Sequence, residues 1–141
     1  MNVKIVATKE EREDAYLVRT KVFIDEQNVP VEEEIDKHEH ESTHFVLYDD
    51  VHSPIGAGRF RILDGIGKVE RICVLSSARQ KGSGIRIMDA IQTFAASRDI
   101  TRLKLNAQTH AIPFYEKLGY QTVSGEFLDA GIPHKTMIKE I

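Results

Sequence analysis

The segment Arg79-Gln80-Lys81-Gly82-Ser83-Gly84 lies between a run of residues typical of a strand and a run typical of a helix. Upstream, residues 68–74 are rich in β-branched and apolar side chains; downstream, apolar residues recur at helical spacing from Ile87 to Ala95. A short turn with two glycines and no acidic residue therefore opens a helix. The free N–H groups and positive dipole end of a helix start attract anions, and Arg79 and Lys81 add positive charge. The segment predicts a site for a phosphorylated ligand.

The segment does not match two common phosphate motifs. Ile87 stands where the dinucleotide fingerprint has its third glycine, and the Gly-Lys-Ser/Thr ending of a nucleoside-triphosphate loop is missing. A Gly-x-Gly turn alone also fits a plain helix entry without a ligand, so a second signal is needed.

That second signal is the segment 107–120, which reads AQTHAIPFYEKLGY and follows a strand-like run at 101–106. Together the two segments resemble the core of the GNAT superfamily of N-acetyltransferases. In that family an Arg/Gln-x-x-Gly-x-Gly/Ala loop cradles the pyrophosphate of acetyl-CoA, and an Ala-x-x-x-Tyr-Glu-Lys-x-Gly-Phe/Tyr helix places a tyrosine near the thioester sulfur. With its segments 19–27 and 131–134, the chain looks most like the small bacterial ElaA/YjcF-type members. The matching residues are Arg79, Gly82, Gly84, Ala111, Tyr115, Glu116, Lys117, Gly119 and Tyr120.

The resemblance implies acetyl-CoA as co-substrate. It places the pyrophosphate on N–H groups from Gln80 to Ile85. In that family a bulge in the preceding strand lets backbone groups, here those of residues 72–74, bind pantetheine and the thioester carbonyl. This oxyanion-hole role is worth about 3 kcal/mol per donor. Gln108 stands where many members carry Asn at the pantetheine arm. The implied cofactor-binding residues are Ile72, Cys73, Val74, Arg79, Gln80, Lys81, Gly82, Ser83, Gly84, Ile85, Gln108 and Tyr115.

Tyr115 is the first catalytic candidate, because a phenol can donate a proton or a hydrogen bond to a departing thiolate. Its plain alternative is an aromatic packed beside Phe114. Glu70 is the candidate base, since some family members carry a glutamate at this place. A carboxylate paired with Arg59 or Arg61 on the adjacent strand is the alternative for Glu70.

Other side chains leave further routes open. His110 and His134 are less favoured bases, because a structural or pocket-lining role is the preferred interpretation of each. A water relay would use no single side chain. Cys73 raises the question of an acetyl-cysteine intermediate, but a lone cysteine in an apolar strand is more often a small buried hydrophobe.

Residues 40–44 read His-Glu-Ser-Thr-His, the zinc-protease pattern, which requires both histidines on one helical turn. Here the segment leads into a strand-like run, where residues four apart lie roughly 13 Å apart. We therefore expect no metal site. The acidic run at 32–36 is interpreted as a solvated loop, with attraction of a cationic amine as the alternative.

Composition narrows the class of protein. The chain has 141 residues, 41% of them hydrophobic and 29% charged, which indicates one globular domain spanning residues 1–141. A net charge of −3 argues against a nucleic-acid partner, and no apolar run is long enough to span a membrane. The charged N-terminus is no signal peptide, and a single cysteine suits a reducing cytoplasm.

These patterns predict an α/β (α+β) fold: one GNAT-like domain with a central mixed, mostly antiparallel sheet of about six or seven strands flanked by helices. The expected activity is acetyl transfer from acetyl-CoA to the primary amine of a small molecule, by direct attack. The alternative is a non-catalytic acyl-CoA-binding module of the same fold. The acceptor is not identified, and the assembly is left open, a homodimer being common among relatives of this size.

Overall fold

One eight-stranded sheet organises the computed structural model, which describes residues 1–141. The strand order is β1-β2-β3-β4-β5-β8-β6, with β7 paired to β8. Only β4 and β5 are parallel neighbours. The predicted mixed sheet is confirmed, and the three-residue β7 is the strand the sequence did not indicate. The strands are β1 (Asn2–Ile5), β2 (Thr43–Tyr48), β3 (Pro54–Leu63), β4 (Ile66–Val74), β5 (Arg102–Gln108), β6 (Gln121–Thr122), β7 (Phe127–Asp129) and β8 (Ile132–Glu140).

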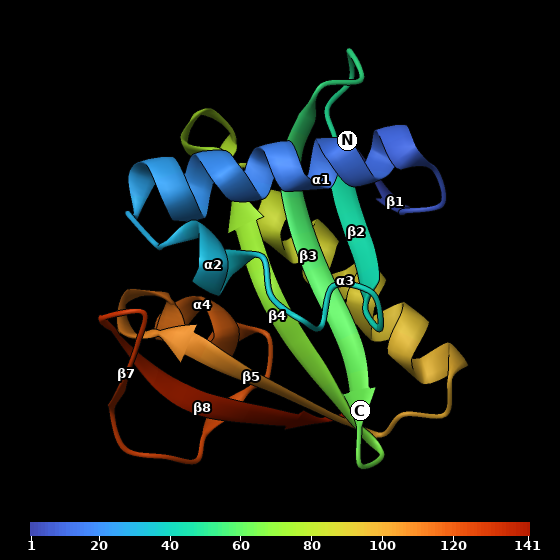
Figure 1. Ribbon diagram of the computed structural model, residues 1–141. Coiled ribbons are helices and arrows are strands. Elements are labelled where there is room, and N and C mark those ends of the chain that lie inside the picture. Colours follow the sequence, from blue (N-terminus) through green and yellow to red (C-terminus); the bar gives the residue numbers. More distant parts are fainter.

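Helices cover both faces of the N-terminal half of the sheet (Figure 1). α1 crosses β2, β3 and β4 on one face, and α3 packs on the other. None of the helices is both long and apolar enough to cross a membrane. The helical segments are α1 (Lys9–Arg19), η1 (Thr20–Glu26), α2 (Val31–Glu34), η2 (Ser76–Ala78), α3 (Ser83–Ser97), η3 (Thr109–Ala111) and α4 (Ile112–Lys117).

Strand β2 shows why the sheet needs a helix on each face. Successive side chains of a strand point to opposite faces, and every residue from Phe45 to Tyr48 is buried. Phe45 and Leu47 belong to the core beneath α3, whereas Val46 and Tyr48 pack with Ala15 and other residues of α1. The sheet is thus the middle layer between two hydrophobic cores.

The first helix begins as the sequence predicts and ends in an unexpected geometry. The Thr8 side chain accepts a hydrogen bond from the Glu11 N–H, and the Glu11 carboxylate accepts one from the Thr8 N–H, forming a capping box. After Arg19 the chain continues into η1 as a π-helix, in which the N–H of Gln27 bonds to the carbonyl of Val22, five residues back. π-helical turns are rare and often occur at functional sites.

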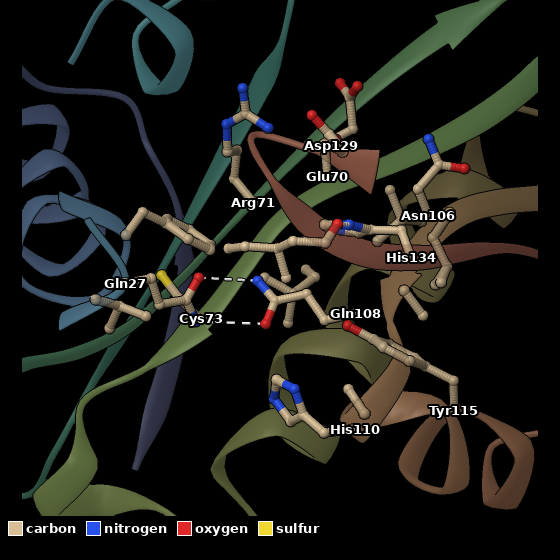
Figure 2. Close-up of a pocket in the computed structure, with 18 of the residues that line it drawn as sticks. Gln27, Glu70, Arg71, Cys73, Asn106, Gln108, His110, Tyr115, Asp129 and His134 are labelled. Atoms are coloured by element: carbon tan, nitrogen blue, oxygen red, sulfur yellow. Dashed lines mark hydrogen bonds between the residues drawn. The ribbon is translucent and has the colours of Figure 1, made fainter. Parts of the chain in front are cut away.

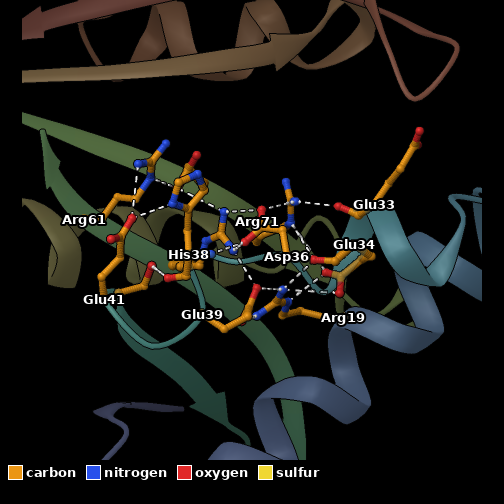
Figure 3. Close-up of polar contacts among 12 residues, drawn as sticks. Arg19, Glu33, Glu34, Asp36, His38, Glu39, Glu41, Arg61 and Arg71 are labelled. Atoms are coloured by element: carbon orange, nitrogen blue, oxygen red, sulfur yellow. Dashed lines mark hydrogen bonds and ion pairs between the residues drawn. The ribbon is translucent and has the colours of Figure 1, made fainter.

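The acidic segment after η1 is not a solvated loop, which corrects the favoured interpretation. It forms α2 and a turn, and the carboxylates of Glu34, Asp36 and Glu39 bind arginines from the helix and sheet (Figure 3), whereas Glu32 and Glu33 are exposed. Arg19, only 1% exposed, pairs with Glu34 at 2.7 Å and with Glu39 at 2.8 Å. Asp36 pairs with Arg59 at 2.8 Å and Arg71 at 3.1 Å. The run therefore anchors the segment across β3 and β4.

Candidate active site

The central feature of the site is a cleft between β4 and β5. These strands pair only at Gly67 with Leu103 and at Lys68 with Lys104, and then separate toward their C-terminal ends. The cleft holds a cavity of about 720 Å³, within the range of small-molecule and cofactor sites. Residues of β4, β5, β8 and η1 line it together with Tyr115, as Figure 2 shows.

A β-bulge in β4 contributes to this separation. Ala57 pairs with Cys73 and Arg59 with Glu70, so the single residue Gly58 faces two residues of β4. One of these two, Arg71, has a φ of 57°, in the left-handed region. A bulge bends its strand and increases the local twist. Residues 72–74, which follow it, all line the cavity, where the resemblance places the pantetheine and thioester contacts.

The glycine-containing loop joins the end of β4 to α3. Gly82 has a φ of 80° and directly precedes the helix, a conformation that side-chain-bearing residues rarely adopt. Arg86 makes the first helical hydrogen bond, to Gly82, so the N–H groups of residues 83–85 have no protein partner. Gly84 has a packing role, because a Cβ there would lie 3.0 Å from the Phe114 ring. Of the predicted loop residues, only Arg79 lines the cavity itself; residues 80–85 lie beyond its lining.

Two side chains of the π-helical turn reach across the cleft. Glu26 forms a bidentate pair with the Arg79 guanidinium at 2.8 and 2.9 Å, and Arg79 also donates to the carbonyl of Val74. The Gln108 amide nitrogen donates to the Gln27 amide oxygen at 2.8 Å (Figure 2). The predicted residues Arg79 and Gln108 are thus held by Glu26, the last residue of η1, and by Gln27, which follows it, and no sequence pattern indicated these contacts.

Tyr115 lies on α4 with its ring packed edge-on against Phe114 and Tyr120, at centroid distances of 5.0 and 5.9 Å. Burial raises the pKa of its phenol above the usual value, so the hydroxyl stays protonated at neutral pH. The hydroxyl has no hydrogen-bond partner. It is also not fully buried, because the only fully buried side-chain atoms without a partner are His44 Nδ1 and Arg59 Nε. The Tyr115 hydroxyl is therefore a free donor open to the cavity it lines.

Glu70 also lines the cavity, but it is already engaged. Its Oε1 accepts hydrogen bonds from Arg61 at 2.9 Å and from Arg59 at 3.1 Å. Burial alone would raise the pKa of Glu70, but the hydrogen bond from Arg61 and the two positive charges outweigh it and lower the pKa. A lowered pKa makes a carboxylate a weaker base. In this structure Glu70 is therefore a carboxylate paired with Arg59 and Arg61, and its role as base stays a prediction.

Cys73 and the two histidines complete the lining. Burial raises the pKa of the Cys73 thiol to about 12, which leaves almost no thiolate for a covalent mechanism. His110 is exposed at the end of β5. His134 is 8% exposed, and its Nδ1 lies 2.6 Å from the carbonyl oxygen of Ile132.

The zinc-protease pattern does not form its site. His44 lies in β2 with Nε2 2.9 Å from the carbonyl oxygen of Glu39, and His40 lies in the preceding turn. The two histidines do not share a helix, and no group of three or more ligating side chains is arranged for a metal ion.

Comparison with known proteins agrees with this geometry. Residues 6–141 match the model of the acetyltransferase (GNAT) domain family. The chain is 53% identical over 141 residues to the uncharacterized N-acetyltransferase YjcF of Bacillus subtilis, covering 99% of this chain and 100% of the relative. The crystal structure of Escherichia coli ElaA superposes with a TM-score of 0.85 at 20% identity, covering 99% of each chain. An aminoglycoside 6'-N-acetyltransferase complexed with coenzyme A superposes with a TM-score of 0.77 at 16% identity, covering 99% of this chain and 97% of the other.

The family match spans nearly the whole chain, including the separated strands β4 and β5 and the loop at the end of β4. The protein is therefore a member of the GNAT acetyltransferase family, an acyltransferase enzyme that uses acyl-CoA.

Proposed function

We propose that the protein transfers an acetyl group from acetyl-CoA to a primary amine by direct attack in a ternary complex. The observation that carries the proposal is the cleft between β4 and β5, which is open to the Tyr115 hydroxyl and includes Arg79 of the loop that leads to α3. This arrangement offers one place for a thioester and another for a pyrophosphate.

In the proposed complex the pyrophosphate binds the unpaired N–H groups of residues 83–85, with Gln80, Lys81 and Gly82 forming the rest of the loop. Pantetheine lies along the backbone of residues 72–74 and displaces the amide pair of Gln27 and Gln108. The adenosine end stays outside the cavity, beside the basic side chains Lys81 and Arg86.

The chemistry then needs few groups. The amine nitrogen attacks the thioester carbonyl, the C–N bond forms and the C–S bond breaks. Backbone N–H groups near the bulge stabilise the oxyanion, and the Tyr115 hydroxyl donates to the leaving sulfur. Because its phenol stays protonated, Tyr115 is available as a donor throughout the neutral pH range.

The proposal is tested first by titration calorimetry of acetyl-CoA into protein freed of co-purified CoA, with EDTA present. Micromolar one-to-one binding is expected. Thiol release from acetyl-CoA is then followed with a polyamine, an aminoglycoside, an amino sugar and a peptide amine. Binding without thiol release for any amine would identify a non-catalytic acyl-CoA-binding module, and no binding by the folded protein would contradict the cofactor assignment.

Replacement of Tyr115 by Phe tests the sulfur contact. We expect turnover to fall at least tenfold, because the leaving thiolate loses its donor, while acetyl-CoA affinity stays within about twofold. Tyr120→Phe is the matched control, since Tyr120 packs against the same ring but does not line the cavity. Unchanged turnover in Tyr115→Phe would remove this hydroxyl from the mechanism.

A further inference from the structure

We propose that His134 is the general base that takes a proton from the acceptor amine, with Nε2 as the accepting atom. The inference rests on the proposed transferase function and adds the group that the cofactor site does not supply. An alkyl ammonium has a pKa near 10.4, so at neutral pH it needs a base before it can attack. Histidine is the side chain most often used for this purpose.

The hydrogen bond to Ile132 fixes the protonation of the neutral ring. A carbonyl oxygen can only accept, so Nδ1, 2.6 Å from it, carries the hydrogen. Nε2 is then the unprotonated nitrogen. A backbone carbonyl in this role sets the tautomer and orientation of an imidazole. The contact also steadies the imidazolium that forms once Nε2 has gained a proton.

Nε2 is free and faces the cavity. It has no hydrogen-bond partner, and the only enclosed side-chain atoms without one are His44 Nδ1 and Arg59 Nε. His134 as a whole is only 8% exposed, and it lines both the cavity and a smaller pocket beside it that shares Arg71, Gln108 and Asp129, so Nε2 opens into this joint space. Among the cavity's titratable groups, His134 and Tyr115 thus present free atoms to the same space.

The sheet places His134 where an acceptor would meet the thioester. His134 pairs directly with Gln108 in the β5–β8 register, so both side chains leave the same face of the sheet. Figure 2 draws the ring beside Asn106, with Glu70 and Asp129 on one side of it and Gln108 and Tyr115 on the other. The Phe127 ring stacks on the imidazole at 6.0 Å and 22°, which holds its plane.

The other candidate bases are less suitable in geometry. Glu70 Oε1 is occupied by two guanidinium groups, and Cys73 is a buried thiol. His110 is exposed on the short turn after β5 and has no hydrogen bond to orient its ring. A base needs a free lone pair in a fixed direction, with no cation held against it. Glu70 Oε2 is free, but its carboxylate is shared with Arg59 and Arg61. Asp129 also lines the cavity, but it is exposed and no hydrogen bond orients it. His134 meets all of these conditions.

The step balances in atoms and charge. The ammonium gives one proton to Nε2 and becomes a neutral amine, whose lone pair forms the C–N bond. As the C–S bond breaks, the nitrogen loses its second proton through the Tyr115 hydroxyl, which passes its own proton to the sulfur. Free CoA and the acetylated amine leave, and the imidazolium releases its proton to solvent.

The test compares wild type with His134→Ala, His134→Gln and Glu70→Gln in single-turnover thiol release from acetyl-CoA. The acceptors are spermidine, kanamycin, glucosamine and a tetrapeptide with a free N-terminus. We expect at least a hundredfold slower release in both His134 variants, unchanged acetyl-CoA affinity, and partial rescue of His134→Ala by added imidazole. His52→Ala, which removes an exposed histidine stacked on Tyr48, should match wild type.

A second readout needs no acceptor. Two-bond proton–nitrogen spectra of the wild-type imidazoles, assigned against His134→Gln, should show Nδ1 protonated and Nε2 unprotonated. A protonated Nε2 in the neutral ring overturns the inference, as does release within threefold of wild type in His134→Gln. Loss in Glu70→Gln alone would identify Glu70 as the base. If wild type binds acetyl-CoA but releases no thiol, the proposed function fails and the base fails with it.

Discussion

Glu26 is an unusual neighbour for Arg79, which the motif resemblance predicts to bind phosphate. Its carboxylate holds both terminal nitrogens of Arg79 in the ligand-free protein, at the mouth of the cleft where a pyrophosphate would bring further negative charge. The hydrogen bond from Arg79 lowers the pKa of Glu26, so the carboxylate stays charged at neutral pH. Coenzyme binding must therefore compete with this pair.

Glu26→Gln should tighten acetyl-CoA binding by up to about fivefold, because Arg79 is released and one negative charge is removed. The size follows from the roughly 0.2–1 kcal/mol that a partly exposed ion pair contributes. Calorimetric titration measures the change, and Glu13→Gln, on the exposed side of α1, is the control. Weaker binding in Glu26→Gln would mean that Glu26 orients Arg79 for the phosphate instead of competing with it.

At the scale of elements, the acidic segment depends on its ion pairs. Burial alone would raise the pKa values of Asp36 and Glu39, but hydrogen bonds and charges from Arg59 and Arg19 lower both to about 2. A carboxyl group whose pKa is lower in the folded than in the unfolded state stabilises the protein at higher pH. This stabilisation is lost as the pH falls. We expect the free energy of unfolding to drop between about pH 4.5 and pH 2, by on the order of 1 kcal/mol per carboxylate.

Urea unfolding at pH 7 and pH 3 measures this loss. Asp36→Asn should be less stable than wild type at pH 7 and should lose less stability on acidification, since one titrating group is gone. An equal loss in wild type and Asp36→Asn would show that Asp36 does not titrate with folding.

Gly67 determines how closely β4 can approach β5 at the closed end of the cleft. A Cβ at this position would lie 2.6 Å from Phe60 Cε2 and 2.9 Å from Leu103 Cδ2, both in the core. Gly67→Ala should destabilise the fold by about 1–3 kcal/mol through this overpacking. Chemical denaturation measures the change. Gly125→Ala, where a Cβ would meet nothing within 4 Å, is the control, and equal stability of the two variants would contradict the argument.

These elements also show how much of the structure can be predicted from the sequence. Local signals predicted the Thr8 capping box, the turn at Asp64 and Gly65, whose φ values are 52° and 77°, and the helix start after Gly82. The motif resemblance predicted the functional roles of Tyr115 and the loop, which stay predictions. The contacts of Glu26 with Arg79 and of Gln27 with Gln108 join residues 53 and 81 positions apart. Local sequence periodicity cannot predict such contacts, because they follow from the packing of η1 over the cleft.

For the whole molecule, the sheet consists of two halves joined by two register pairs, Gly67–Leu103 and Lys68–Lys104. A coenzyme in the cleft would contact both halves and bridge them. Acetyl-CoA at a hundred times its Kd should raise the free energy of unfolding by about 2.7 kcal/mol, by mass action. Calorimetric melting measures this, and hydrogen exchange should slow in β4 and in β5 together. Protection of β4 alone would place the ligand on one half only.

The π-helical turn has a consequence for how this chain can change over time. An α-helix advances about 100° per residue, so removing one residue from η1 and restoring α geometry would turn Gln27 more than a quarter of a revolution away from Gln108. The face of α1 that packs on the sheet is fixed by Ala15 and Val18 in the core, whatever the geometry of η1. Insertions and deletions within η1 can thus re-aim the residues over the cleft while the helix before it keeps its packing.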